Sequence, residues 1–289
     1  MAVLIVSYNT RDALRGCLRT LLETAADLRV IVVDNASSDG SVEMVRSEFP
    51  GVLAVEAGAN LGFGRGTNLA ASRTTRDFLL TLNPDCAAPP AAIAAMAGRL
   101  AKDEQIGFVG PRVALESGAP DRAGLRGDPD PLGAFLYLTR LSRLAPRSRG
   151  LNRYNLTYLD YDSEHELLAG TGGCLLLRAA AFHQVGGFDE AFFMYGEDLD
   201  LCRRIREAGW RGLYLPSARV THTKGESTRR SSARMLVEFH RAMWVYYRKH
   251  EAPRRPAPLN WLVAAGIVAL GALRLARNAL RQDGRVSAR

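Results

Sequence analysis

Three acidic residues crowd into four positions of the stretch "FFMYGEDLDLCRR" (192–204), namely Glu197, Asp198 and Asp200. A carboxylate at the edge of a buried surface can act as a general base, because partial desolvation and a neighbouring acid make it a better proton acceptor. The chemistry that these residues suggest is therefore proton transfer. The spacing of the residues around them indicates which carboxylate is placed to perform it.

Apolar residues at helical spacing define a buried stripe through this segment: Leu199, Cys202 and Ile205. Asp198 lies at the edge of the stripe and is the predicted base. Asp200 points away from the stripe and can pair with Arg204 at i+4, which predicts a solvated acid. Glu197 is predicted in the cap region, where the helix dipole favours a carboxylate.

A single carboxylate, Asp85, ends the apolar stretch at "LNPDC" (82–86). A hard cation such as Mg²⁺ or Mn²⁺ needs few protein ligands when substrate phosphates supply the others. The same letters also fit an ordinary Asn-Pro-Asp turn, and this motif alone favours the turn. His222 follows a later strand in "ARVTH", where a lone histidine is more often a structural hydrogen-bonding residue than a metal ligand.

Polar residues follow four predicted strands in succession: "SYN" (7–9), "DNAS" (34–37), "NLGFG" (60–64) and "NPD" (83–85). In open α/β sheets, ligands bind outside the carboxyl ends of the strands. The glycines of "NLGFGRG" also suggest a dinucleotide site. That fit is poor, because the fingerprint belongs to the first strand-to-helix turn, and here that turn, "SYNTRD", has no glycine.

Short apolar runs alternate with amphipathic segments along the first part of the chain. We predict strands at 2–8, 29–37, 51–58, 77–86 and 106–113, separated by helices at 10–24, 38–49, 66–74 and 89–103. Later segments predict a strand and helix within 170–190 and a strand pair within 212–222. This order predicts an α/β fold with a mixed, mostly parallel sheet and helices on both faces.

Two segments depart from this rhythm. Residues 117–162 are rich in Gly, Pro and Arg and predict a long, partly mobile loop excursion within a domain spanning 1–225. Residues 226–289 predict a basic helical extension with an apolar helix at 259–273. Residues 219–289 hold 15 Lys and Arg against 4 Asp and Glu, a net charge of +11 that leaves −3 for the remainder of the +8 chain.

The basic extension suggests an anionic membrane surface or a nucleic acid as partner, and no recognised nucleic-acid motif accompanies it. The apolar run is shorter than the ~20 residues that span a bilayer, so we expect a helix lying in the interface or, alternatively, docked on protein. Four scattered cysteines and no evident secretory signal predict a reduced, cytoplasmic protein. The basic extension and the apolar helix predict a peripheral position on the inner face of the cell membrane, where anionic headgroups attract Lys and Arg.

Taken in order, these stretches resemble a family 2 glycosyltransferase with the GT-A fold, over most of residues 2–223. The resemblance rests on "VSYN", "VVDNASSDGS", "NLGFGRGTN", "LNPD", "GTGGCLLLRAAAF", "GGFDEAFFMYGEDLDLCRRIREAGW" and "YLPSARVTH". Within the family, the chain is similar to the rhamnosyltransferase-like branch, which builds bacterial cell-wall and polysaccharide linkages.

The resemblance implies an inverting transfer of a sugar from a nucleoside diphosphate sugar to an acceptor hydroxyl, here a lipid-linked glycan. Rhamnose from dTDP-rhamnose is the predicted donor; galactofuranose, glucose and N-acetylglucosamine donors stay open. Asp198 matches the family's catalytic base. Asp85 stands at the last position of the Asp-x-Asp metal motif, with Asn83 at the first, and His222 matches a residue that completes a Mn²⁺ or Mg²⁺ site.

The resemblance also implies two further sets of site residues. The predicted nucleotide-binding set is Ser7, Tyr8, Asn9, Asp34, Asn60, Gly62 and Asn68. The predicted sugar and acceptor set is Gly172, Gly173, Asp189 and Glu197. Two other function classes remain open at this point: an NAD(P)-dependent oxidoreductase, and a non-catalytic module that binds a nucleotide sugar or a membrane.

Overall fold

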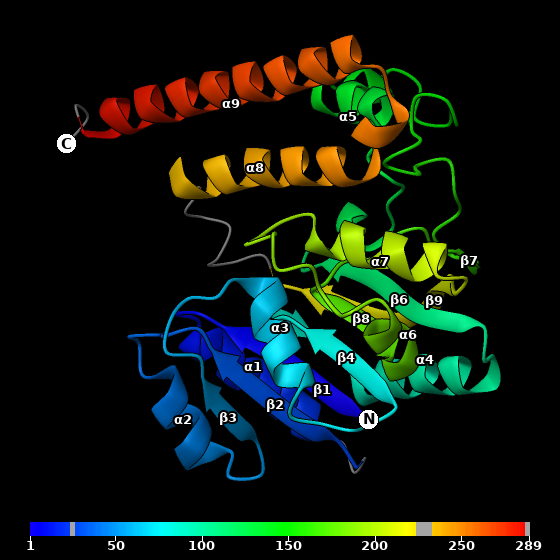
Figure 1. Ribbon diagram of the computed structural model, residues 1–289. Helices are drawn as coiled ribbons and strands as arrows, with labels where there is room; N and C mark the ends of the chain where they lie inside the picture. Colours follow the sequence, from blue (N-terminus) through cyan, green and yellow to red (C-terminus); the bar gives the residue numbers. More distant parts are fainter. Residues whose placement is uncertain (24–26, 224–232, 287–289) are drawn as a thin grey trace.

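The computed structural model describes residues 1–23, 27–223 and 233–286. One mixed β-sheet runs through the protein, with helices on both faces, as the sequence predicts (Figure 1). The strand order is β3-β2-β1-β4-β8-β6-β9-β5, and β7 pairs with β9. The strands are β1 (Ala2–Ser7), β2 (Arg29–Asp34), β3 (Leu53–Glu56), β4 (Phe78–Leu82), β5 (Cys86–Ala87), β6 (Ile106–Leu115), β7 (His165–Glu166), β8 (Cys174–Arg178) and β9 (Arg211–His222).

The first four strands are parallel, and β8 lies antiparallel between β4 and β6. Strand β9 is again parallel to β6. The predicted strand pair at 212–222 is wrong, because β9 is one continuous strand. Its register with β6 shifts where Pro111 pairs with Leu215 and Arg112 with Arg219, so an irregularity takes the place of the expected turn.

Side chains along the central strands point alternately to the two faces of the sheet and pack into two separate apolar cores. In β1, Val3 and Ile5 face one core and Ala2 and Leu4 face the other. The first core is covered by α1 (Arg11–Leu22), α2 (Ser41–Glu48) and α4 (Pro90–Lys102). The second is covered by α3 (Phe63–Ala71), α6 (Ala179–Gln184) and α7 (Glu197–Glu207). The helix that carries the three crowded acids therefore packs on the second face.

The predicted excursion at 117–162 contains regular structure of its own. It holds the turns η1 (Arg122–Gly124) and η2 (Leu141–Arg143) and the helix α5 (Pro131–Leu138). Asp130 caps α5 by accepting hydrogen bonds from the backbone N–H groups of Leu132 and Gly133, both at 3.1 Å. The segment folds over the second face of the sheet, near the end of α9 that begins at Ala257 (Figure 1).

The C-terminal extension forms two long helices, α8 (Ala233–His250) and α9 (Ala257–Val286), joined through η3 (Ala252–Arg254). Figure 1 shows α8 above α7, with α9 running back along α8 as the outermost layer. The apolar stretch of α9 is longer than predicted: Ala257–Leu280, 24 residues, is long and apolar enough to cross a membrane. Helices of this length and composition also pack on protein, so this property alone does not place α9 in a bilayer.

Candidate active site

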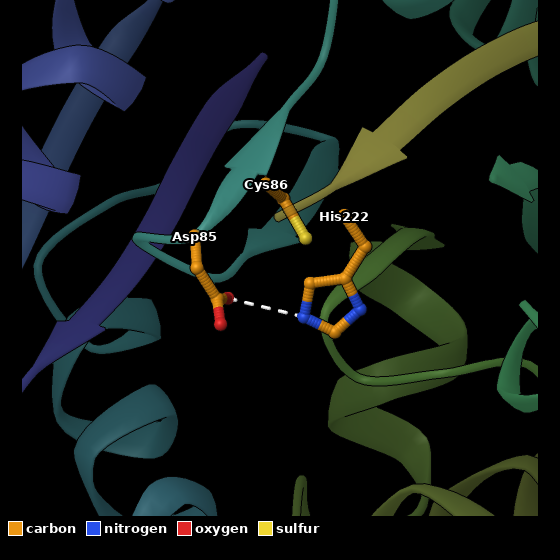
Figure 2. A group of neighbouring side chains, drawn as sticks. All are labelled: Asp85, Cys86 and His222. Carbon is orange, nitrogen blue, oxygen red and sulfur yellow. Dashed lines mark hydrogen bonds and ion pairs between the residues drawn. The ribbon is translucent and has the colours of Figure 1, made fainter. Parts of the chain in front are cut away.

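A carboxylate and an imidazole meet where the short strand β5 pairs with the end of β9. The pairing sets Cys86 opposite His222 and brings the preceding Asp85 to the histidine ring. Asp85 Oδ1 lies 3.2 Å from His222 Nε2, and Figure 2 shows the two side chains facing each other beside Cys86. The ligand atoms of these three residues all lie within 4.8 Å of one another.

This group fits a divalent cation. Carboxylate and imidazole are ordinary ligands for Mn²⁺, and the other ring nitrogen of His222 contacts Asp121 Oδ2 at 3.1 Å, a contact that orients a metal-binding histidine. Burial by itself would lower the pKa of His222, but the hydrogen bonds to Asp121 and Asp85 outweigh it and raise the pKa to about 9. Burial raises the pKa of the Cys86 thiol, which makes Asp85 and His222 the better ligands.

Asp198 is held in place by contacts from three directions. Its Oδ2 accepts a 2.5 Å hydrogen bond from the guanidinium of Arg126 and a 3.1 Å bond from the backbone N–H of Gly172. Its Oδ1 accepts from the N–H of Leu199 at 2.8 Å, as expected at a helix N-terminus. Each carboxylate oxygen can accept twice, so these contacts orient Asp198 and leave it able to take a proton. The predicted position at the edge of the buried stripe is confirmed.

Glu197 is the first residue of α7, next to Asp198, and is buried. Burial, reinforced by the adjacent charge of Asp198, raises the pKa of Glu197 well above its usual range. Its Oε2 has no hydrogen-bond partner among the described residues. Burial and the adjacent Asp198 therefore favour the neutral, protonated form of Glu197.

The prediction that Asp200 is a solvated acid is wrong, although its pairing with Arg204 is confirmed at 2.7 Å. The Asp200 side chain is 0% exposed, because α8 covers it. Its Oδ1 lies 2.7 Å from His250 Nε2 and 2.8 Å from Lys249 Nζ. The hydrogen bond with His250 and the charges of Arg204 and Lys249 outweigh the effect of burial and lower the pKa of Asp200 to about 2. The buried cluster ties α7 to α8.

The strand-end residues of the predicted nucleotide set gather as expected at the ends of β1 and β2. Ser7 and Asp34 are neighbours in the parallel register, and both are buried. Asp34 Oδ2 accepts from the N–H of Ser37 at 2.8 Å, while Oδ1 has no hydrogen-bond partner among the described residues. Asn9 Oδ1 accepts from the N–H of Ser38 at 2.8 Å, and Tyr8 next to it is exposed.

The residues around α3 already have structural partners. Asn60 Oδ1 accepts from the N–H of Gly62 at 3.1 Å. Gly62 has φ +82°, and a Cβ there would lie 2.1 Å from the carbonyl oxygen of Phe193, so only glycine fits. Asn68 bonds the backbone N–H and C=O of Phe188, both at 2.9 Å. These contacts hold the 188–193 segment, and direct nucleotide binding by the three residues stays a prediction.

The predicted sugar and acceptor residues divide into two places. A Cβ on Gly172 would lie 3.6 Å from the Cβ of Asp198, and one on Gly173 would lie 3.1 Å from the Asn83 amide, so the two glycines lie beside Asp198 and Asn83, respectively. Asp189 is elsewhere: its Oδ2 pairs with Lys249 at 2.5 Å, and it is not among the residues that line the cavity beside Asp198.

A cavity of about 1000 Å³ opens beside these groups. Asn83, Arg126, Gly172, Glu197 and Asp198 line one part of it. The remainder is lined mainly by apolar residues of α5, α8 and α9. Asp198 and the C-terminal helices therefore share one continuous space, and Asp85 and His222 are not among the residues that line it.

Sequence reasoning missed Arg126 and Asp121, which hold Asp198 and His222. Both come from the segment 117–162, which has no periodicity that would place a side chain. The nearby charge of Asp198 raises the pKa of Arg126, despite the opposing effect of burial, and this guanidinium stays charged. A positively charged partner is expected near a buried carboxylate such as Asp198, but no pattern in the sequence identifies Arg126 as that partner.

Comparison with known proteins identifies the family of this chain. The family described as "Glycosyltransferase like family 2" matches residues 1–243. The chain is 31% identical over 297 residues to an N-acetylglucosaminyl-diphospho-decaprenol L-rhamnosyltransferase of Mycobacterium tuberculosis, covering 99% of this chain and 95% of that protein. It is 25% identical over 232 residues to the rhamnosyltransferase WbbL of Escherichia coli, covering 76% and 82% of the two chains.

Two solved structures share the fold at low sequence identity. The mannosyltransferase PcManGT of Pyrobaculum calidifontis, in complex with GDP-Man and Mn²⁺, has a TM-score of 0.59 at 18% identity and covers 99% of this chain and 79% of its own. GalNAc-T7 with UDP, GalNAc and Mn²⁺ has a TM-score of 0.61 at 16% identity and covers 90% and 52%. The predicted GT-A architecture is confirmed.

Proposed function

This chain belongs to glycosyltransferase family 2, and on that premise we propose that it transfers rhamnose, with inversion, from dTDP-rhamnose to a hydroxyl of a lipid-linked N-acetylglucosamine diphosphate. The class of enzyme follows from the family. The sugar and the acceptor are inferred from the name of the mycobacterial relative, which matches this chain over nearly its whole length, and the dTDP carrier is inferred from the resemblance to the rhamnosyltransferase-like branch.

The observation that carries the proposal is the position of Asp198. Its carboxylate lines the same cavity as Gly172 and as Asn83, which stands two residues before Asp85 in the chain. In the proposed reaction, Asp198 takes the proton of the acceptor hydroxyl while the oxygen forms a bond to the anomeric carbon. The bond from that carbon to the diphosphate oxygen breaks on the opposite face, so the configuration inverts, and the nucleoside diphosphate leaves.

Asp85 and His222 would hold a divalent cation, Mn²⁺ or Mg²⁺. Such an ion supplies positive charge to the diphosphate as it leaves. Because Asn83 stands at the first position of the motif, this chain offers one carboxylate where an Asp-x-Asp motif offers two. His222 adds a neutral nitrogen ligand when its imidazole is deprotonated. The nucleoside is assigned to the ends of β1 and β2, where Asp34 has an oxygen without a partner among the described residues.

The first experiment is thermal unfolding with dTDP, UDP, GDP or NAD, each with and without Mn²⁺. A ligand at ~100 times its dissociation constant adds about 2.7 kcal/mol of stability, which is a clear shift. We expect a metal-dependent shift with dTDP, followed by rhamnose incorporation into an N-acetylglucosaminyl-diphospho-polyprenol. A preference for UDP or GDP would replace the proposed donor. A response to NAD alone, or binding without product for every acceptor, would contradict the proposal.

A further inference from the structure

The cavity beside Asp198 is larger and more apolar than a sugar requires. Its volume of about 1000 Å³ is at the upper end for pockets that hold whole drug-sized molecules. Beyond the polar groups around Asp198, its walls carry side chains such as Phe135 of α5, Met243 of α8 and Ile267 of α9. Hydroxyl groups of a glycan would find few partners there, whereas a hydrocarbon chain would be removed from water.

The apolar part of the cavity also reaches the surface through apolar residues. Leu132 and Phe135 of α5 and Leu262 of α9 line the cavity, yet they are 52%, 55% and 69% exposed. Trp261 and Val268 of α9 are exposed as well, but by helical spacing they lie on the face of α9 opposite its lining residues. Exposed apolar side chains mark sites for a protein, a ligand or a membrane, and Leu132, Phe135 and Leu262 place such side chains at the mouth of the cavity.

The apolar surface of α9 indicates the side of the protein from which a lipid would enter the cavity. The stretch Ala257–Leu280 is long and apolar enough to enter a membrane, and none of its most apolar window is buried by the protein. Arg274 and Arg277 follow the apolar run, as in helices that bind anionic membrane surfaces. The mouth of the cavity therefore lies next to the part of the protein best suited to contact lipid.

We propose that the hydrocarbon chain of the lipid-linked acceptor enters this mouth from the membrane and lies between α5 and the α8–α9 pair. The inference rests on the proposed function and adds the place of the lipid. The chain would leave its diphosphate and sugar near Asp198, inside the same cavity. Arg255 also lines the cavity, 3.1 Å from Glu251, and Arg126 lies beside Asp198; each guanidinium has further N–H groups that would donate hydrogen bonds to the diphosphate.

Gly266 offers a substitution that narrows this space without disturbing the fold. It lines the cavity from α9, and a Cβ there meets no atom within 4 Å. Replacing a helical glycine also favours the helix. Gly266→Trp should therefore fold and obstruct the chain. Ala269→Trp is the matched control, because Ala269 is exposed on the same helix and is not among the lining residues.

The assay compares N-acetylglucosamine diphosphate linked to geraniol with the same head group linked to decaprenol, using the full chain in mixed micelles. Gly266→Trp should raise the KM for the decaprenyl acceptor about tenfold or more, the effect of about two buried methylene groups. The KM of Gly266→Trp for the geranyl acceptor should stay within about twofold of the wild-type value. The KM values of Ala269→Trp for both acceptors should also stay within about twofold of wild type. Equal effects of the two variants, or no effect of either, would overturn the inference.

A second measurement does not depend on turnover, so it separates this inference from the proposed function. A decaprenyl diphosphate with a photoreactive group on its chain is cross-linked to the wild-type protein and mapped by mass spectrometry. Labels should fall on lining residues such as Met243, Val263 and Ile267 and should be displaced by unlabelled decaprenyl diphosphate. Labelling only of the outer face of α9, or equal displacement by a bilayer phospholipid, would contradict the assignment even if the enzyme is active.

Discussion

The buried carboxylate Asp200 should control the stability of the layer that α8 adds to the protein. Its pKa falls from 3.8 to about 2 because His250, Arg204 and Lys249 outweigh the cost of burial. Each unit of pKa difference corresponds to about 1.4 kcal/mol, so the charged cluster contributes about 2 kcal/mol near neutral pH. Asp200→Asn removes this charge with little change of shape and should lower Tm by roughly 4–8 °C for a domain of this size.

The dependence on pH provides an internal check. The pKa of Asp200 is lower in the folded protein than in the unfolded chain, so the contribution is complete above about pH 5 and is lost as the pH falls toward 2. The Tm difference between wild type and Asp200→Asn should therefore shrink by about half at pH ~3. The assay is thermal unfolding monitored by circular dichroism, in the same detergent for both proteins.

Asp189 supplies the control, because it pairs with the same Lys249 at 2.5 Å but is 29% exposed. Partly exposed ion pairs contribute about 0–1 kcal/mol, so Asp189→Asn should lower Tm by no more than about 3 °C. If Asp200→Asn were as stable as Asp189→Asn, or if its deficit did not depend on pH, the account of this cluster would be refuted.

Two further predictions concern the site itself. Arg126→Gln should lower kcat by roughly 10²-fold, because Asp198 loses the contact that orients it, while dTDP still stabilises the protein. Arg126→Lys should recover part of the rate. An unchanged kcat for Arg126→Gln would rule out the positioning role. Mn²⁺ affinity should rise with pH by up to about tenfold per unit between pH ~6 and ~8, because metal must displace the proton of His222, whose pKa is about 9. His222→Ala should abolish this dependence, and a pH-independent affinity in the wild type would argue against His222 as a ligand.

The fold was predictable where a local pattern decides it. Short runs rich in β-branched residues, such as 2–7 and 29–34, favour interior strands, and the parallel register of these strands sets Ser7 beside Asp34 at one edge of the sheet. The antiparallel insertion of β8 between β4 and β6 was not predictable in this way. It depends on pairing between strands roughly 70 to 100 residues apart in sequence, for which periodicity carries no information.

In the site as well, residues placed by a local pattern were predictable, and contacts between distant segments were not. Helical spacing correctly placed Asp198 at the edge of the buried stripe, since the pattern and the carboxylate lie on one helix. The same spacing failed for Asp200, because Lys249 and His250 arrive from a helix some fifty residues later and cover the face that α7 alone would expose to water. Arg126 lies in a segment without periodicity, so its contact with Asp198 becomes visible only in three dimensions.

The turnover of Asp198→Asn tests the central claim most directly. Single-turnover transfer from the cognate nucleotide sugar should fall by about 10²- to 10⁴-fold, the usual contribution of a general base. Stabilisation by nucleotide and Mn²⁺ should be unchanged, since Asp198 contacts Arg126 and Gly172 rather than the Asp85–His222 pair. Transfer at the wild-type rate by a variant that binds nucleotide normally would contradict the assignment of Asp198 as the base.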